Sequence, residues 1–242
     1  MKVLAFNASP RGDRGNTALI LNPFLEGMRE ARADVELFYN KKLKINHCQA
    51  CFNCWLKTPG ICSQKDDMRW LLPKMREADV WVLATPVYTD GVTALLKILL
   101  ERTVPLAKPF LELRGNYARH TPVEGTKVSQ IVLVSSCGYW EMENFEPLLA
   151  HIKAFCKNAS AEFAGALLRP HASKLRPMIE NGTPVSDIFE AAKEAGHQLV
   201  KDGKMSTDTL STISRELMPL ETFIESTNEA KRKSLSQRME VA

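Results

Sequence analysis

Four of the six cysteines lie within fifteen residues, in the pattern Cys48-x2-Cys51-x2-Cys54-x7-Cys62. Thiolates on two tight x2 turns and a longer returning loop can converge on an iron–sulfur cubane without strain, and no second set of cysteines points to a second cluster. Four thiolates also satisfy a structural zinc ion, although such sites more often take two pairs from separate knuckles. The spacing therefore favours one [4Fe-4S] cluster and leaves zinc and reduced, unligated cysteines as alternatives.

A second polar segment, Ser9-Pro-Arg-Gly-Asp-Arg-Gly-Asn-Thr17, follows a short apolar run and precedes a helical pattern. Its two glycines allow close approach of the backbone, Arg11 adds positive charge, and the first N–H groups of the helix lack intrahelical partners. Three side chains can donate further hydrogen bonds: Ser9, Asn16 and Thr17. The segment lacks both Gly-Lys-Ser/Thr and G-x-G-x-x-G, so a monophosphate fits better than a triphosphate or a dinucleotide. A plain polar turn capped by Asn16 or Thr17 is the alternative.

Composition excludes several other classes of protein. The 242 residues are 45% hydrophobic, which is enough for a buried core, and 32 Lys and Arg against 28 Asp and Glu give a net charge of only +4. This balance is not typical of nucleic-acid binding. The apolar runs are too short to span a bilayer, and the run that begins the sequence breaks at Asn7 before a signal-peptide core develops. We therefore expect a cytoplasmic protein, whose clustered cysteines are reduced and available for metal binding or catalysis.

Apolar spacing predicts strands that alternate with helices. The strands are expected over residues 2–6, 34–39, 80–84, 127–135 and 162–168, and the helices over 17–32, 66–78, 92–102, 145–157, 185–201 and 207–217. Pro73 should kink its helix or displace its start. The cysteines fall on a long irregular connection over 41–63, residues 103–127 are expected to be an insertion, and the chain after 217 is expected to be a polar end.

This alternation predicts an α/β fold with a doubly wound parallel sheet of five strands, in the flavodoxin-like order 2-1-3-4-5. We expect residues 1–169 to form this domain and residues 170–242 to form a helical extension, packed on the domain or at an oligomer interface. The loops after the first, third and fourth strands begin near Asn7, Thr85 and Ser135, so they should converge on one crevice at the carboxyl edge of the sheet.

Two of these loops resemble the flavodoxin-like NAD(P)H-dependent FMN reductase superfamily: Ser9-Pro10-Arg11 with Gly15-Asn16-Thr17, and Thr85-Pro86-Val87-Tyr88. The resemblance covers about residues 1–168. It implies that the first loop holds the FMN phosphate and that the second lies along the isoalloxazine ring. Gly138 and Tyr139, in the loop after the fourth strand, are further candidates for contact with the flavin. Ala8 departs from the glycine that frequently precedes Ser-Pro-Arg, and Glu101-Arg102 departs from the Asp-Arg that often ends the helix.

With its cysteines and Asp66-Asp67-Met68, the chain resembles the iron-sulfur flavoprotein branch of this superfamily. The resemblance implies FMN together with a [4Fe-4S] cluster on Cys48, Cys51, Cys54 and Cys62. It also implies a dimer or tetramer in which the cluster of one subunit lies near the FMN of another. We expect electron transfer between the two groups, with NAD(P)H or ferredoxin as donor and small molecules as possible acceptors. No catalytic side chain is assigned.

Two other functions remain open. The first is a cluster-free NAD(P)H-dependent FMN or quinone reductase that uses the same flavin site. The second is a redox carrier or sensor without enzymatic activity, whose cluster or thiols report oxidation to a partner.

Overall fold

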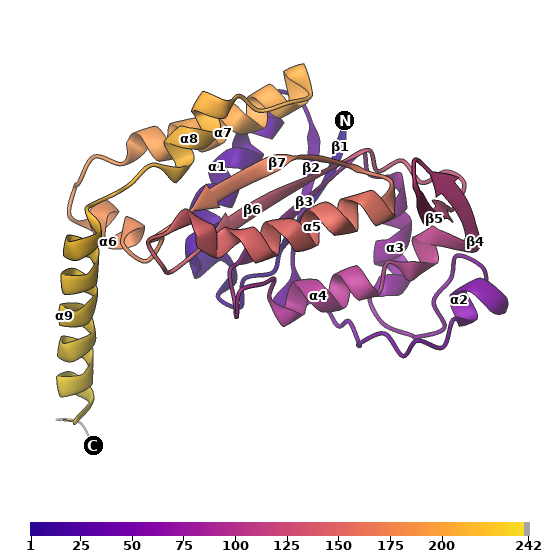
Figure 1. Cartoon of the computed structure of the whole chain (residues 1–242), viewed down its shortest axis with the longest axis horizontal. Helices are drawn as coiled ribbons and strands as arrows, with labels where there is room; N and C mark the ends of the chain where they lie inside the picture. Colours follow the sequence, from indigo (N-terminus) through magenta and orange to yellow (C-terminus); the bar gives the residue numbers. More distant parts are fainter. Residues whose placement is uncertain (240–242) are drawn as a thin grey trace.

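The computed structural model describes residues 1–239 of the chain. A parallel sheet of five strands forms its centre, in the order β2-β1-β3-β6-β7. The strands are β1 (Lys2–Asn7), β2 (Asp34–Tyr39), β3 (Val80–Pro86), β6 (Gln130–Ser136) and β7 (Glu162–Arg169). The order matches the predicted 2-1-3-4-5, so the flavodoxin-like fold class is confirmed. All five carboxyl ends lie at one edge of the sheet (Figure 1).

Helices cover both faces of the sheet because successive side chains of a buried strand point to opposite faces. In β1, Val3 and Ala5 join the core under α1 (Asn16–Glu30) and α7 (Ser186–Asp202). Leu4 and Phe6 join the opposite core, under α3 (Met68–Glu77), α4 (Ala94–Glu101) and α5 (Glu146–Ala159). Pro73 lies inside α3 without displacing its start from Met68.

The connections contain more regular structure than the sequence indicated. Residues 103–127 include an antiparallel hairpin of β4 (Ala107–Arg114) and β5 (Tyr117–Pro122), which follows a 3-10 turn over Val104–Leu106. The cysteine connection contains one helical turn, α2 (Asn53–Leu56). Other 3-10 turns lie at Gly12–Arg14, Asn40–Lys42 and Met142–Phe145. The hairpin and α2 lie together at the right of Figure 1, on the side of the amino ends of the strands.

The chain after residue 217, expected to be a polar end, forms the helix α9 (Leu220–Met239), in agreement with the helical extension expected over residues 170–242. It follows α6 (Leu175–Glu180), α7 and α8 (Thr207–Ser214), and it extends away from the sheet (Figure 1). A helix that is polar on most sides has little apolar periodicity to reveal it, and surface pairs such as Glu229–Lys233, 2.8 Å apart, support such a helix. The last three residues of the expected extension lie outside the described residues. Among residues 1–239, no helix combines the length and apolar character needed to cross a bilayer.

Two glycines set the distance between α1 and α7. A Cβ atom at Gly27 would lie 1.8 Å from the backbone oxygen of Lys193, and one at Gly196 would lie 2.0 Å from the backbone oxygen of Phe24. Backbone cannot yield as the end of a side chain can, so each helix requires glycine where it crosses the other.

We expect Gly196→Ala to destabilise the protein by about 1–3 kcal/mol, as overpacking typically does. Helix propensity alone predicts the opposite sign, a gain of about 1 kcal/mol, so urea unfolding discriminates between the two effects. Gly138→Ala is the matched control, because a Cβ there meets no atom within 4 Å. A stability of Gly196→Ala equal to or above that of the unchanged protein would contradict the close contact.

Candidate functional site

Hydrogen bonds join the three predicted loops at the carboxyl edge of the sheet. Oγ1 of Thr17, in the first turn of α1, lies 2.8 Å from Oγ of Ser136 at the end of β6. The N–H of Val87, after β3, donates to the backbone oxygen of Ser136 at 2.9 Å. The structure therefore brings together the segments that the sequence placed around one crevice.

The first loop is preorganised around Gly12 and Gly15. Gly12 adopts a left-handed backbone with φ of +59°, and a Cβ at Gly15 would lie 2.5 Å from Oγ of Ser9. The N–H of Ser9 donates to Oδ1 of Asn7 at 3.0 Å, which fixes the chain as it leaves β1. Gly15 caps α1 without a side-chain hydrogen bond, so the first N–H groups of the helix are left for an anion.

Two cations that the sequence analysis missed lie beside this loop. Nζ of Lys41 donates to the backbone oxygen of Arg11 at 3.3 Å, and Nη2 of Arg176 donates to that of Arg14 at 3.3 Å. Lys41 could have been found, because it follows β2 and β2 ends at the same edge. Arg176 offered no such signal, since its position depends on how the chain folds back after β7. Both add positive charge where Arg11 was expected to act.

The Thr85–Tyr88 segment is rigid at its base and open at its tip. Thr85 is buried, its Oγ1 accepts from the N–H of Thr93 at 3.1 Å, and its backbone oxygen accepts from Oγ of Ser135 at 2.8 Å. Tyr88 begins a tight turn that closes through hydrogen bonds with Gly91, and its side chain is 64% exposed. The Thr85 hydroxyl thus stabilises the loop, whereas Tyr88 is available to a ligand. Pro86 ends β3 between them.

The loop after β6 presents Gly138 and Tyr139 at the same edge. Tyr139 is 66% exposed, whereas Cys137 is buried and burial raises the pKa of its thiol. Nε1 of Trp140 donates to the backbone oxygen of Met218 at 2.9 Å, which ties this loop to the chain after α8. Trp140 therefore has a structural role, and Tyr139 remains free to contact a ligand.

Two buried side chains hold the C-terminal segment against this loop. The guanidinium of Arg169 donates to the backbone oxygens of Ile213 at 2.6 Å and Arg215 at 2.5 Å. Nε2 of His171 accepts from the N–H of Leu217 at 3.0 Å and lies 3.1 Å from Nη2 of Arg169, so this nitrogen is unprotonated. Burial, and then the charge of Arg169, lower the pKa of His171 to about 4.

The His171 site predicts a pH dependence of stability. Its pKa is about 4 in the folded chain and about 6.5 when unfolded, so only the unfolded state takes up a proton between these values. The free energy of unfolding should fall by up to about 1.4 kcal/mol per unit as pH drops from about 6.5 towards about 4. Urea titrations should show a shallower fall for His171→Gln. Equal slopes for both proteins would contradict a neutral, buried His171.

The four clustered cysteines line one cavity of about 340 Å³. Cys51 is exposed and its pKa is lowered by the N–H of Asn53 and the hydroxyl of Ser63, whereas burial raises the pKa of Cys54. Within residues 1–239, no three His, Cys, Asp or Glu side chains lie close enough together to ligate a single metal ion. Four thiols that line one cavity are the donor set that a [4Fe-4S] cluster requires.

A buried ion pair organises this cysteine cavity. The Arg102 guanidinium, 1% exposed, binds both carboxylate oxygens of Asp66 at 2.6 and 3.0 Å. It also donates to the backbone oxygen of Asn46 at 2.7 Å and to Sγ of Cys62 at 3.3 Å. One side chain at the end of α4 thus joins Asn46 and Asp66, which lie on either side of the four cysteines in the chain, to the predicted ligand Cys62. The sequence analysis noted Arg102 only as part of a departure from the family pattern.

The cysteine connection also packs against the hairpin. Nε1 of Trp55, one residue after Cys54, donates to the backbone oxygens of Ala107 at 2.8 Å and Val104 at 3.3 Å. The hairpin lies near the amino ends of the strands, whereas the loop from Ser9 to Thr17 lies at the carboxyl edge (Figure 1). Within one chain, the two candidate cofactor sites are therefore separated along the sheet.

This fold and the anion loop are typical of flavodoxin-like flavoproteins, and comparison with known sequences identifies the family within this class. The NADPH-dependent FMN reductase family matches residues 1–138, and the chain belongs to this family. An iron-sulfur flavoprotein from Archaeoglobus fulgidus is 40% identical over 103 residues, 43% of this chain and 49% of the relative. One from Methanocaldococcus jannaschii is 39% identical over 106 residues, 44% of this chain and 53% of the relative. The resemblance to iron-sulfur flavoproteins is confirmed over the matched residues, and the chain spans about half of the length of these relatives.

Solved structures support the fold. An FMN-dependent NADH-azoreductase from Bacillus anthracis superposes with a TM-score of 0.61 at 14% identity, covering 83% of this chain and 99% of that one. An NAD(P)H:quinone oxidoreductase from Methanothermobacter marburgensis gives a TM-score of 0.57 at 14% identity, covering 82% and 96%. At 14% sequence identity, this structural similarity shows that the chains share a fold.

Proposed function

We propose that this chain is an FMN-dependent oxidoreductase that passes electrons between FMN and a [4Fe-4S] cluster. The observation that carries the proposal is the presence, in one chain, of a preorganised anion loop and one cavity lined by four thiols. When bound, FMN supplies hydride and single-electron chemistry and the cluster supplies single-electron chemistry. NAD(P)H or ferredoxin as donor, and a small molecule as acceptor, belong to the same proposal.

The flavin would lie at the carboxyl edge of the sheet. Its phosphate would be bound by the loop from Ser9 to Thr17, with Arg11, Gly15 and Asn16 and the helix N–H groups as donors. Its ring would lie along the segment from Thr85 to Tyr88, with Pro86 and Val87, and would face Gly138 and Tyr139. The exposed rings of Tyr88 and Tyr139 are suited to cover a planar ligand and exclude water from it.

We expect Thr17→Ala to weaken FMN binding about tenfold or more, because a hydrogen bond to a charged group is worth about 1.5–3 kcal/mol. The substitution also removes the contact with Ser136 that joins two of the loops. Thr17→Ser, which keeps the hydroxyl, is the matched control and should bind FMN nearly as well as the unchanged chain. Equal FMN affinity of Thr17→Ala and the unchanged chain in fluorescence titrations would remove Thr17 from the site.

The cluster would be held by Cys48, Cys51, Cys54 and Cys62. The N–H donated by Arg102 to the sulfur of Cys62 is of the kind that stabilises thiolate ligands and adjusts cluster potentials. Exposed apolar side chains surround this region: Leu56 on α2, Ile61 on the cysteine connection and Leu113 on the hairpin. They support a dimer or tetramer in which the cysteine connection of one subunit approaches the flavin crevice of another, since the two sites of one chain are separated.

Cys51→Ser should abolish the cluster and leave FMN bound, because the thiol lies away from the carboxyl edge. The measurement is iron, sulfide and zinc content of anaerobically purified protein, with FMN content measured on the same sample. Cys156→Ser is the matched control, since that thiol is buried in the core with a pKa raised to about 12 by burial. Near-zero iron and sulfide in the unchanged protein would exclude the cluster, and loss of FMN from Cys51→Ser would show that the two sites are not separable.

A cluster-free NAD(P)H-dependent FMN or quinone reductase is the second candidate. The observation that favours it is that the anion loop from Ser9 to Thr17 is preorganised by its own glycines and by the start of α1, without the cysteines. Turnover with NADH or NADPH and a quinone by protein without iron would select this function. Reduction by ferredoxin with no turnover from either pyridine nucleotide would select electron transfer through the cluster, as an enzyme or as a carrier.

A further inference from the structure

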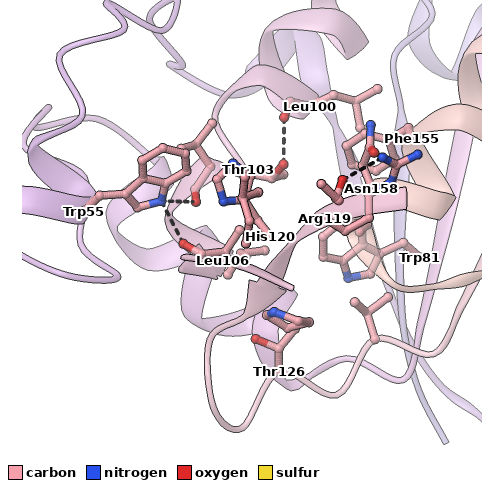
Figure 2. Close-up of a pocket in the computed structure, with 17 residues that line it drawn as sticks. Trp55, Trp81, Leu100, Thr103, Leu106, Arg119, His120, Thr126, Phe155 and Asn158 are labelled. Atoms are coloured by element: carbon pink, nitrogen blue, oxygen red, sulfur yellow. Dashed lines mark hydrogen bonds between the residues drawn. The ribbon is translucent and has the colours of Figure 1, made fainter. Parts of the chain in front are cut away.

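A second cavity, of about 450 Å³, lies between the hairpin, the cysteine connection and the end of α5. Trp81 lines it from the second position of β3, and Ala159 lines it from the last position of α5. Both positions belong to the amino edge of the sheet, opposite the carboxyl edge of the flavin crevice. Figure 2 shows the cavity with its lining side chains. Its volume lies within the range of about 300–1,000 Å³ that small-molecule sites occupy.

Aromatic rings form much of the wall. Trp55, Trp81 and Phe155 all line the cavity, and the ring of His120 packs on that of Trp55 with centroids 4.8 Å apart. The indole N–H of Trp81 donates to the backbone of α3, and that of Trp55 donates to the hairpin, so both rings are held in place. Fixed aromatic walls favour a flat, apolar occupant.

The charged side chain that lines the cavity is positive. Among the described residues, no Asp or Glu lines the cavity, whereas Arg119 does. The Arg119 guanidinium lies 5.0 Å from the ring centroid of Tyr117 and donates one hydrogen bond to the backbone oxygen of Ala118 at 2.8 Å. Within residues 1–239 it makes no ion pair. Arg119 and Asn158 both line the cavity, and Figure 2 shows them on the side away from Trp55. A guanidinium beside an amide is suited to bind a carboxylate.

Two lining residues also contain polar atoms without partners. Nδ1 of His120 and Oγ1 of Thr126 are buried, and neither has a hydrogen-bond partner among the described residues. A buried polar atom without a partner costs free energy. A small rotation of either side chain would turn that atom towards an occupant with a polar substituent on its ring.

We infer that this cavity is a binding site for a small planar aromatic carboxylate of one or two rings. Its ring lies between Trp55, Trp81 and Phe155, and its carboxylate binds Arg119 and Asn158. The site is separate from the flavin crevice and requires neither cofactor. It adjoins the cysteine cavity, because Val104 lines both cavities and Trp55 follows Cys54 in the chain. An occupant therefore contacts the segment that carries the predicted cluster ligands.

Isothermal titration of the full-length protein with 2-naphthoate tests this site, with neutral 2-naphthalenemethanol as the matched ligand. We expect saturable binding of the carboxylate and at least about tenfold weaker binding of the alcohol, which corresponds to about 1.4 kcal/mol. Arg119→Gln should weaken naphthoate binding about tenfold or more and should remove the preference for the carboxylate. Lys108→Gln removes the same charge from the exposed side of β4 and should leave both affinities unchanged.

Ala118→Phe tests the cavity itself, since Ala118 lines it and a larger side chain there fills it. This variant should lose naphthoate binding while it keeps FMN affinity, which reports that the fold is intact. Equal affinity for both ligands in the unchanged protein and in Arg119→Gln would overturn the inference. Absence of saturable naphthoate binding, together with a smaller assembly for Ala118→Phe in sedimentation, would also overturn it and would identify the cavity as a subunit contact.

Discussion

Parallel pairing of five strands is the constraint on which the rest of this molecule depends. It places every carboxyl end at one edge, so three loops that are far apart in sequence meet there. Short hydroxyl side chains then link the loops: Thr17 with Ser136, and Thr93 with the backbone after β1. The same pairing places the hairpin near the opposite edge, which separates the aromatic cavity and the cysteine cavity from the predicted flavin crevice.

Two buried arginines, Arg102 and Arg169, hold the cysteine connection and the C-terminal segment against the rest of the fold. Arg102 holds the cysteine connection through a carboxylate, a carbonyl and a thiol, whereas Arg169 holds the C-terminal segment mainly through backbone carbonyls. Burial lowers the pKa of Arg169 to about 10, so its charge is retained at neutral pH despite the cost of desolvation. Because a buried charge costs free energy unless it is paired and hydrogen-bonded, each guanidinium takes its partners from several chain segments at once.

The parts of this structure that local pattern determines could be predicted from the sequence. Apolar runs located the sheet, and glycines with hydroxyls located the anion loop before α1. Contacts between distant segments could not be predicted, because no local pattern records that Arg176 reaches the first loop or that Arg102 reaches Cys62. The polar helix α9 was missed for a related reason, since its few apolar residues, such as Phe223, give no clear period.

The crossing of α1 and α7 has a consequence for the history of this protein. At Gly27 and Gly196 each backbone occupies the volume that a methyl group on the other would need, so neither position can acquire a side chain while the other helix stays in place. Substitution at one site requires a shift of the whole opposing helix rather than a compensating change at one residue. The two glycines should therefore be retained or lost together among descendants, and their joint presence would mark chains in which this C-terminal arrangement has been inherited.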